Sequence, residues 1–155
     1  MVKKVVYAYL VADILHYGHI QHLYKAKHQG NYLIVGILTD KATMEKKPKP
    51  ILPYLERKRT MEAIKYVDEV IPQHEYSPLE NVKRLHPDVL MESESHSKQP
   101  ANEYVKEYGG EVIVTPYYKG ISSTSIKDKV KKEWKIKGGK NGMWENIINK
   151  SLYLF

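Results

Sequence analysis

A chain of 155 residues with 42% hydrophobic and 28% charged residues is long enough for one compact domain and has the composition of an ordinary globular protein. The absence of cysteine excludes disulfides and thiolate metal sites, and no apolar run approaches the roughly 20 residues that cross a bilayer. The net charge of +7 fits two kinds of partner, a nucleic acid or a small polyanion.

Much of the excess positive charge lies between Lys127 and Lys140. We interpret this run as a solvated helix face followed by a basic tail, because nucleic-acid modules combine clustered bases with exposed aromatic side chains. The N-terminus passes directly into a strand-like run and lacks the features of a signal peptide. We therefore expect a cytoplasmic protein that binds neither nucleic acid nor membrane.

Two kinds of segment alternate along the chain. Short runs of β-branched and aromatic residues predict buried strands, and longer runs with apolar residues at helical spacing predict helices. This alternation predicts an α/β fold with a parallel sheet covered by helices on both faces, and such sheets bind ligands beyond the carboxyl ends of their strands. In chain order we predict strand 5–10, helix 18–28, strand 32–38, helix 55–66, strand 69–71, helix 78–85, strand 89–91, helix 99–108, strand 112–115 and helix 122–132.

The last part of the chain differs from the rest. Residues 134–155 are interrupted by glycines and then become apolar. We predict a domain over residues 1–133 and a C-terminal extension over 134–155, which packs on the domain or covers a partner subunit.

The strongest functional signal is His16-Tyr17-Gly18-His19, which follows the first strand and opens the next helix. A helix N-terminus offers unpaired N–H groups and a positive dipole end, so it binds phosphate well. Gly18 allows close approach of the backbone to a ligand, and two imidazoles can stabilise charge that develops on a leaving pyrophosphate. The alternatives are a metal-binding histidine pair and surface histidines without a role.

A second signal, Gly120-Ile121-Ser122-Ser123-Thr124, follows the last strand and also opens a helix. The hydroxyls can bind phosphate or simply cap the helix. Because both signals lie at strand-to-helix turns, we expect them at the same edge of the sheet.

A third signal is basic. Lys46, Lys47 and Lys49 lie in a proline-rich loop, and Arg57 lies in the following helix. Mobile lysines can close over a triphosphate and an arginine can bind its oxygens in pairs, whereas for each residue taken alone a solvated surface charge is the ordinary interpretation.

These motifs together resemble the cytidylyltransferase family of the H-x-G-H nucleotidyltransferase superfamily. The resemblance covers roughly residues 4–130 and includes the bacterial glycerol-3-phosphate and phosphonate cytidylyltransferases, with the phosphonate branch favoured by Tyr118–Ser123. It implies a Rossmann-like fold, a homodimer, Mg²⁺, and transfer of CMP from CTP to a phosphate- or phosphonate-bearing small molecule with release of pyrophosphate. The matching segments, in family order, are Asp13–His19, Arg57, Tyr66–Pro72 and Gly120–Thr124.

The resemblance also implies roles for single residues. His16, His19, Lys46 and Arg57 are the implied catalytic residues, and Asp13 is implied to order the first turn or hold the metal, with a plain turn residue as the alternative. The implied nucleotide-binding residues are Tyr9, Leu10, Asp13, Gly18, Glu94, Gly120, Ile121, Ser122, Ser123 and Thr124.

Three places depart from the family pattern, and the first is the end of the first strand, where Tyr9-Leu10 stands in place of an expected glycine. The stretch Met91–His96 lacks the usual tryptophan and has Glu94 where an aspartate is usual, and Tyr117 stands where an arginine is often found. These departures leave open an adenylyltransferase that uses ATP, and a nucleotide-binding regulator with weak catalysis.

Overall fold

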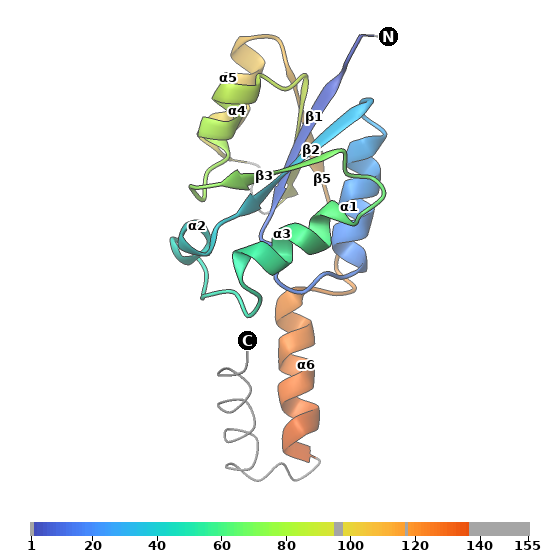
Figure 1. Ribbon diagram of the computed structural model, residues 1–155, viewed down its shortest axis with the longest axis vertical. Helices are drawn as coiled ribbons and strands as arrows, with labels where there is room; N and C mark the ends of the chain where they lie inside the picture. The colour runs from blue at the N-terminus through green and yellow to red at the C-terminus, as the bar shows by residue number, and fades with distance from the viewer. Residues whose placement is uncertain (1, 95–97, 117, 137–155) are drawn as a thin grey trace. The chain divides into compact units, whose positions relative to one another are not determined.

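The computed structural model describes residues 2–94, 98–116 and 118–136. Its five strands form one parallel sheet in the order β3-β2-β1-β4-β5, so the strand order reverses between β1 and β4 (Figure 1). This topology confirms the predicted α/β, Rossmann-like class. The strands are β1 (Val5–Leu10), β2 (Tyr32–Leu38), β3 (Glu69–Gln73), β4 (Val89–Ser93) and β5 (Glu111–Thr115). The helices are α1 (Tyr17–Lys27), α2 (Asp40–Met44), α3 (Tyr54–Glu62), α4 (Leu79–Leu85), α5 (Pro100–Glu107) and α6 (Ser123–Ile136).

Apart from shifts of one or two residues at element ends, the elements differ from the prediction in three places. Helix α2 was not predicted, because a single turn shows no apolar period; the Thr39 hydroxyl caps it by accepting from the Ala42 N–H at 3.1 Å. Helix α3 ends at Glu62 rather than at residue 66, where turns replace the helical bonds. Helix α6 continues to Ile136, beyond the predicted end at residue 132.

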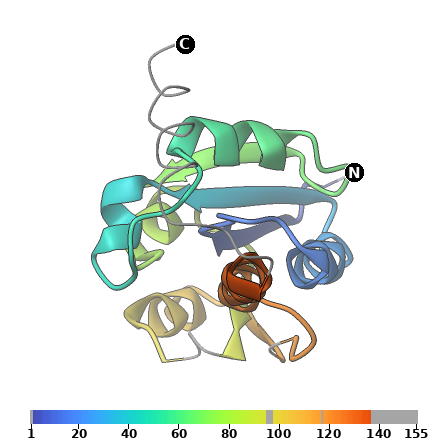
Figure 2. The same cartoon turned by 90° about the horizontal axis from the view of Figure 1, so that it is seen from below.

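Each face of the sheet is covered by its own helices. Leu23 and Met61, from α1 and α3, pack with Val6 and Val35 of the strands on one face. On the other face the cluster includes helical residues of α4 and α5 together with Tyr7 and Leu90. Figure 1 and Figure 2 show α1 and α5 on opposite sides of the strands. Neighbouring positions along β1 therefore face different layers, with Tyr7 and Tyr9 on the α4/α5 side.

The core on the α4/α5 side contains a buried polar network. The Tyr7 hydroxyl donates to Oε1 of Gln73 at 2.7 Å and accepts from Nδ2 of Asn81 at 2.8 Å. A Cβ on Gly36 would lie 2.0 Å from that hydroxyl, so the tyrosine requires glycine at this position.

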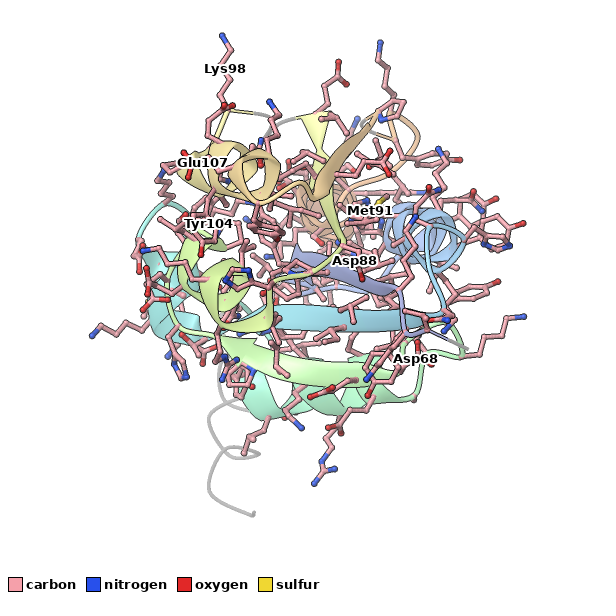
Figure 3. All side chains as sticks on the ribbon, turned by 90° about the horizontal axis from the view of Figure 1, so that it is seen from above. Asp68, Asp88, Met91, Lys98, Tyr104 and Glu107 are labelled. Atoms are coloured by element: carbon pink, nitrogen blue, oxygen red, sulfur yellow. The ribbon has the colours of Figure 1, made fainter. Side chains whose placement is uncertain are left out.

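Two aspartates fix the amino ends of the strands. The Asp88 carboxylate accepts from the Val5 N–H at 2.7 Å, and the Asp68 carboxylate accepts from the Leu33 N–H at 2.6 Å. Figure 3 labels both aspartates and views the molecule from the edge at which β1 begins. The amino edge is thus tied by side chain to backbone bonds, and the predicted ligand-binding residues follow the opposite edge.

The chain divides into two compact units, Met1–Ser122 and Ser123–Phe155. The described part of the second unit is α6, so the predicted extension over 134–155 lies mostly outside the described residues. Within the described ranges, each helix is either too short or too polar to cross a membrane.

Candidate functional site

The loop between β1 and α1 has an unusual backbone. Ala12 has φ of 53°, in the left-handed region that non-glycine residues rarely occupy, and its side chain is buried. The next residue, Asp13, is also buried, and its Oδ1 accepts from the Leu52 N–H at 2.9 Å. Strain at Ala12 and the bond from Leu52 set the direction in which the chain leaves the sheet.

His16 and His19 come together where α1 begins. His16 is the N-cap residue with extended φ and ψ, and its carbonyl accepts from the His19 N–H at 3.0 Å. The two imidazole rings stack with centroids 3.8 Å apart and planes at 24°. A Cβ on Gly18 would lie 3.1 Å from the His16 ring and 3.4 Å from Cβ of Tyr118. The absence of a side chain at Gly18 therefore leaves room for this arrangement.

Both histidines are neutral near pH 7. Burial lowers the pKa of His16, and burial with the neighbouring His16, His22 and Lys47 charges lowers the pKa of His19 to about 3. The Nδ1 atoms of His16 and His19 are buried and have no hydrogen-bond partner among the described residues. Such unsatisfied ring nitrogens are costly in a core and are typical of a binding site.

The proline-rich loop places Lys47 within electrostatic reach of His19. Partial burial of the Lys47 ammonium lowers its pKa, and its positive charge contributes to the lowered pKa of His19. Lys46, the lysine expected from the sequence, lies with its ammonium 5.0 Å from the centre of the Tyr76 ring, and the Lys47 ammonium is 5.9 Å from it. Nothing in the sequence indicates which of these adjacent lysines influences His19.

Arg57 lies inside the protein, with a fully buried side chain. Its Nη1 donates to the carbonyls of Val11 at 2.6 Å and Leu38 at 2.8 Å, and its Nε donates to the Leu52 carbonyl at 3.0 Å. Its Nη2 pairs with Asp40 at 2.5 Å. Four of the five guanidinium N–H groups therefore bind protein oxygens, which come from the ends of β1 and β2, the start of α2 and the loop before α3. In this structure Arg57 fixes the loops of the site, and a direct contact with a triphosphate stays a prediction.

A buried carboxyl group that the sequence analysis did not select lies at the end of β4. Glu92 is fully buried, and its Oε2 accepts from the Tyr9 hydroxyl at 2.8 Å, which in turn accepts from Nε2 of Gln99 at 2.9 Å. Burial raises the pKa of Glu92 to about 8, against the lowering effect of the Tyr9 hydrogen bond. The sequence does contain one signal for Glu92, because this charged residue directly follows the apolar run Val89–Met91.

The other predicted residues near these strands have different environments. Leu10 is partly buried and packs against the α1/α3 core, whereas Glu94 is exposed. Ser95, His96 and Tyr117 lie outside the described residues.

His22, also missed from the sequence, connects α1 to β5. Its Nδ1 lies 2.9 Å from the Thr115 hydroxyl, which donates to the Glu92 carbonyl at 3.1 Å. Burial lowers the pKa of His22 to about 4, so the ring is neutral. These hydrogen bonds connect α1, which follows His16 and contains His19, to the carboxyl ends of β5 and β4.

The second phosphate-binding candidate is divided between the two units. Gly120, Ile121 and Ser122 precede α6 in the first unit, and Tyr118 of the same loop packs edge-on against Tyr17 with ring centroids 5.4 Å apart. Ser123 and Thr124 begin α6 and belong to the second unit. A shared contact of His19 and Ser123 with one ligand therefore stays a prediction.

Comparison with known proteins agrees with this arrangement. The cytidylyltransferase-like family matches residues 11–129. Glycerol-3-phosphate cytidylyltransferase of Bacillus subtilis (strain 168) is 36% identical over 129 residues, which cover 83% of this chain and 97% of that protein.

Two further relatives support the same assignment. The same enzyme of Staphylococcus aureus (strain NCTC 8325 / PS 47) is 37% identical over 128 residues, covering 82% of this chain and 95% of that protein. Among solved structures, the lipopolysaccharide core biosynthesis protein of Thermoplasma volcanium GSS1 superposes with a TM-score of 0.65 at 26% identity, covering 77% of this chain and 99% of that one. The chain belongs to the cytidylyltransferase-like family and is a nucleotidyltransferase.

Proposed function

We propose that this enzyme transfers CMP from CTP to a small acceptor that bears a phosphate or a phosphonate, and releases pyrophosphate. The observation that carries the proposal is the stacked pair His16 and His19 at the start of α1, beside the point where the strand order reverses. Doubly wound sheets bind nucleotides at this point, and helix N-termini bind phosphate. The names of the two glycerol-3-phosphate cytidylyltransferases support CTP as the donor.

The reaction needs positioning and charge neutralisation rather than a covalent enzyme intermediate. An oxygen of the acceptor anion attacks the α-phosphorus of CTP, and the bond from that phosphorus to the bridging oxygen breaks as pyrophosphate leaves. Neutral His16 and His19 each donate one N–H to oxygens of the triphosphate, where negative charge grows during the step. Lys46 and Lys47 neutralise the same charge, and the charge of Lys47 also contributes to the lowered pKa of His19.

The remaining predicted residues form the walls of the proposed nucleotide site. In this proposal the backbone of Gly120 and Ile121 and the hydroxyl of Ser122 bind phosphate oxygens, and Tyr9, Leu10 and Glu94 border the nucleotide or acceptor. The same role for the hydroxyls of Ser123 and Thr124 stays a prediction. Arg57 acts as a positioning residue, because its bonds to Val11 and Leu38 hold the loop that leads to His16.

The described residues fit a magnesium ion that arrives with the triphosphate rather than an ion held in a protein cage. Among them, no three histidine or carboxylate side chains gather as a metal site. Mg²⁺ commonly keeps several waters and is held by one or two carboxylates together with substrate phosphates. Asp13 is the candidate carboxylate, with one oxygen oriented by the Leu52 N–H. When bound, the ion would screen the negative charge of the phosphates.

Pyrophosphate release with CTP and Mg²⁺ tests the proposal directly. The protein is incubated with glycerol 3-phosphate, 2-hydroxyethylphosphonate or 2-aminoethylphosphonate, and ATP replaces CTP in a parallel series. We expect release with CTP and at least one acceptor, and tighter binding of CTP than of ATP in calorimetry. Turnover with ATP alone would replace the proposal by an adenylyltransferase, and tight CTP binding without turnover would indicate a regulator.

A further inference from the structure

The carboxyl group of Glu92 is placed where a ligand is expected. Tyr9 is in β1 and Glu92 is in β4, the two strands between which the strand order reverses, and both lie near the carboxyl ends of those strands. Gln99, which completes the hydrogen-bonded chain to Glu92, immediately precedes α5. Three polar groups from three elements therefore converge on the edge that binds ligands in sheets of this kind.

Half of this carboxyl group is unsatisfied. The Tyr9 hydroxyl donates to Oε2, whereas the buried Oε1 has no hydrogen-bond partner within the part of the chain that the structure describes. None of the ion pairs between described residues includes Glu92. A buried carboxyl group with an unpaired oxygen and no countercharge is costly to keep, so the free Oε1 of Glu92 calls for a partner such as a ligand, an ion or a water molecule.

The hydrogen-bond directions around Glu92 define what the empty oxygen can bind. Gln99 donates to the Tyr9 oxygen, so the Tyr9 proton points to Glu92 and Oε2 is the accepting atom. Oε1 carries the proton of the neutral acid, and in the ionised carboxylate it becomes an acceptor for a donor supplied from outside the described chain. A cationic donor suits it best, because it provides both the missing hydrogen bond and the missing countercharge.

We propose that Glu92, oriented by Tyr9 and Gln99, binds a primary ammonium group on the acceptor substrate. This inference rests on the proposed function and narrows it to amino-bearing phosphonates or phosphates. Binding places the ammonium against Oε1 and converts a neutral buried acid into one member of an ion pair. Since the pKa of Glu92 is about 8 without a ligand, the carboxyl group is mostly protonated at pH 7 and loses its proton when the ammonium binds.

The test compares two acceptors that differ in one group, 2-aminoethylphosphonate and 2-hydroxyethylphosphonate. The wild-type protein should show a kcat/KM for the amino compound that is higher by about 10- to 100-fold, the range of one charge-assisted hydrogen bond. Glu92→Gln should abolish this preference, and Tyr9→Phe should reduce it less, because Tyr9 only orients the carboxylate. Glu103→Gln, which removes an exposed carboxylate of α5, is the matched control and should keep the wild-type preference.

Calorimetry gives a second readout that does not require turnover. Titration of 2-aminoethylphosphonate at pH 7 in buffers of different ionisation enthalpy should show release of close to one more proton by the wild type than by Glu92→Gln. The hydroxyl compound should show no such difference.

The outcomes separate this inference from the proposed function. A hydroxyl preference in the wild type, or an unchanged preference in a folded Glu92→Gln protein, overturns the ammonium site while CTP turnover still supports the enzyme. No CTP binding would contradict the proposed function, and the direct titration of 2-aminoethylphosphonate would still decide the role of Glu92. Circular dichroism of each variant establishes that it is folded.

Discussion

The imidazole of His16 lies on that of His19, with ring centroids 3.8 Å apart, and the Nδ1 atoms of both rings lack partners among the described residues. Two neutral rings this close can donate to neighbouring oxygens of one polyphosphate. A pair of protonated rings would repel each other at the same distance, and the lowered pKa values keep both rings neutral. The stacking is therefore compatible with a shared anionic ligand at physiological pH.

Replacement of either histidine should reduce turnover much more than it reduces CTP binding. We expect His16→Asn and His19→Asn each to lower kcat by about 100- to 1,000-fold, the loss found when one transition-state donor is removed. The double variant should lose less than the product of the two effects, because the residues act on one group. Pyrophosphate release gives kcat and calorimetry gives the CTP affinity. His74→Gln, at an exposed histidine, is the control; equal losses in all three single variants would contradict the assignment.

Arg57 should be essential for stability, and not only for activity. Lysine retains the charge but has a single nitrogen, which cannot reach the Val11, Leu38 and Leu52 carbonyls and Asp40 at once. Arg57→Lys should lower the free energy of unfolding by about 3 kcal/mol, because buried carbonyls lose hydrogen bonds from a charged donor. Urea unfolding measures this loss. Arg59→Lys changes an exposed guanidinium and should stay near the wild type; similar stability of both variants would show that the buried bonds are unimportant.

The sequence was informative wherever chemistry depends on local order. Alternating strands and helices predict the parallel sheet, and His16-Tyr17-Gly18-His19 is a local turn whose helix position follows from the strand before it. The roles of distant residues could not be predicted in this way. The sequence favoured Arg57 either as a phosphate-binding residue or as a solvated charge, and only the packing of α3 brings its guanidinium to the carbonyls of Val11 and Leu38.

Glu92 shows the same limit at a single position. Its distance along the chain from Tyr9 is 83 residues, and their hydrogen bond depends on the pairing of β1 with β4. The family pattern favours Glu94, two positions later. The register of β1 and β4 places Ala8 beside Met91. The next residue, Glu92, therefore lies beside Tyr9, and it is Glu92 rather than Glu94 that is buried.

The positive charge of Lys47 should make a small contribution to the lowered pKa of His19. Because the positive charge of Lys47 contributes to the lowered pKa of His19, Lys47→Gln should raise that pKa toward the ordinary value. Burial is the larger cause, so the pKa should remain well below 6.5. Chemical shifts of the His19 ring protons, followed by NMR as a function of pH, measure the change. Lys41→Gln removes an exposed charge of α2 and serves as the control; identical titration curves in the wild type and Lys47→Gln would contradict the predicted proximity.

The stability difference between the wild type and Glu92→Gln should depend on pH in a defined direction. The pKa of Glu92 is raised to about 8 in the folded protein from an ordinary 4.5 in the unfolded chain. Between these values the folded state keeps a proton that the unfolded state has lost, so the wild type loses stability as pH rises, by up to about 1.4 kcal/mol per pH unit. Glutamine has no proton to lose at this position. The difference should therefore shift in favour of Glu92→Gln from pH 4.5 to pH 8 and be constant below pH 4.5.

Urea unfolding of both proteins at several pH values measures this difference. Because His19 and His22 titrate in both proteins, their contributions cancel in the comparison. Addition of 2-aminoethylphosphonate should reduce the slope for the wild type alone, since an ammonium at Oε1 stabilises the ionised carboxylate. A difference that does not change with pH would mean that Glu92 ionises normally in the folded protein. Its carboxylate would then be stabilised by water or by a cation from outside the described part of the chain.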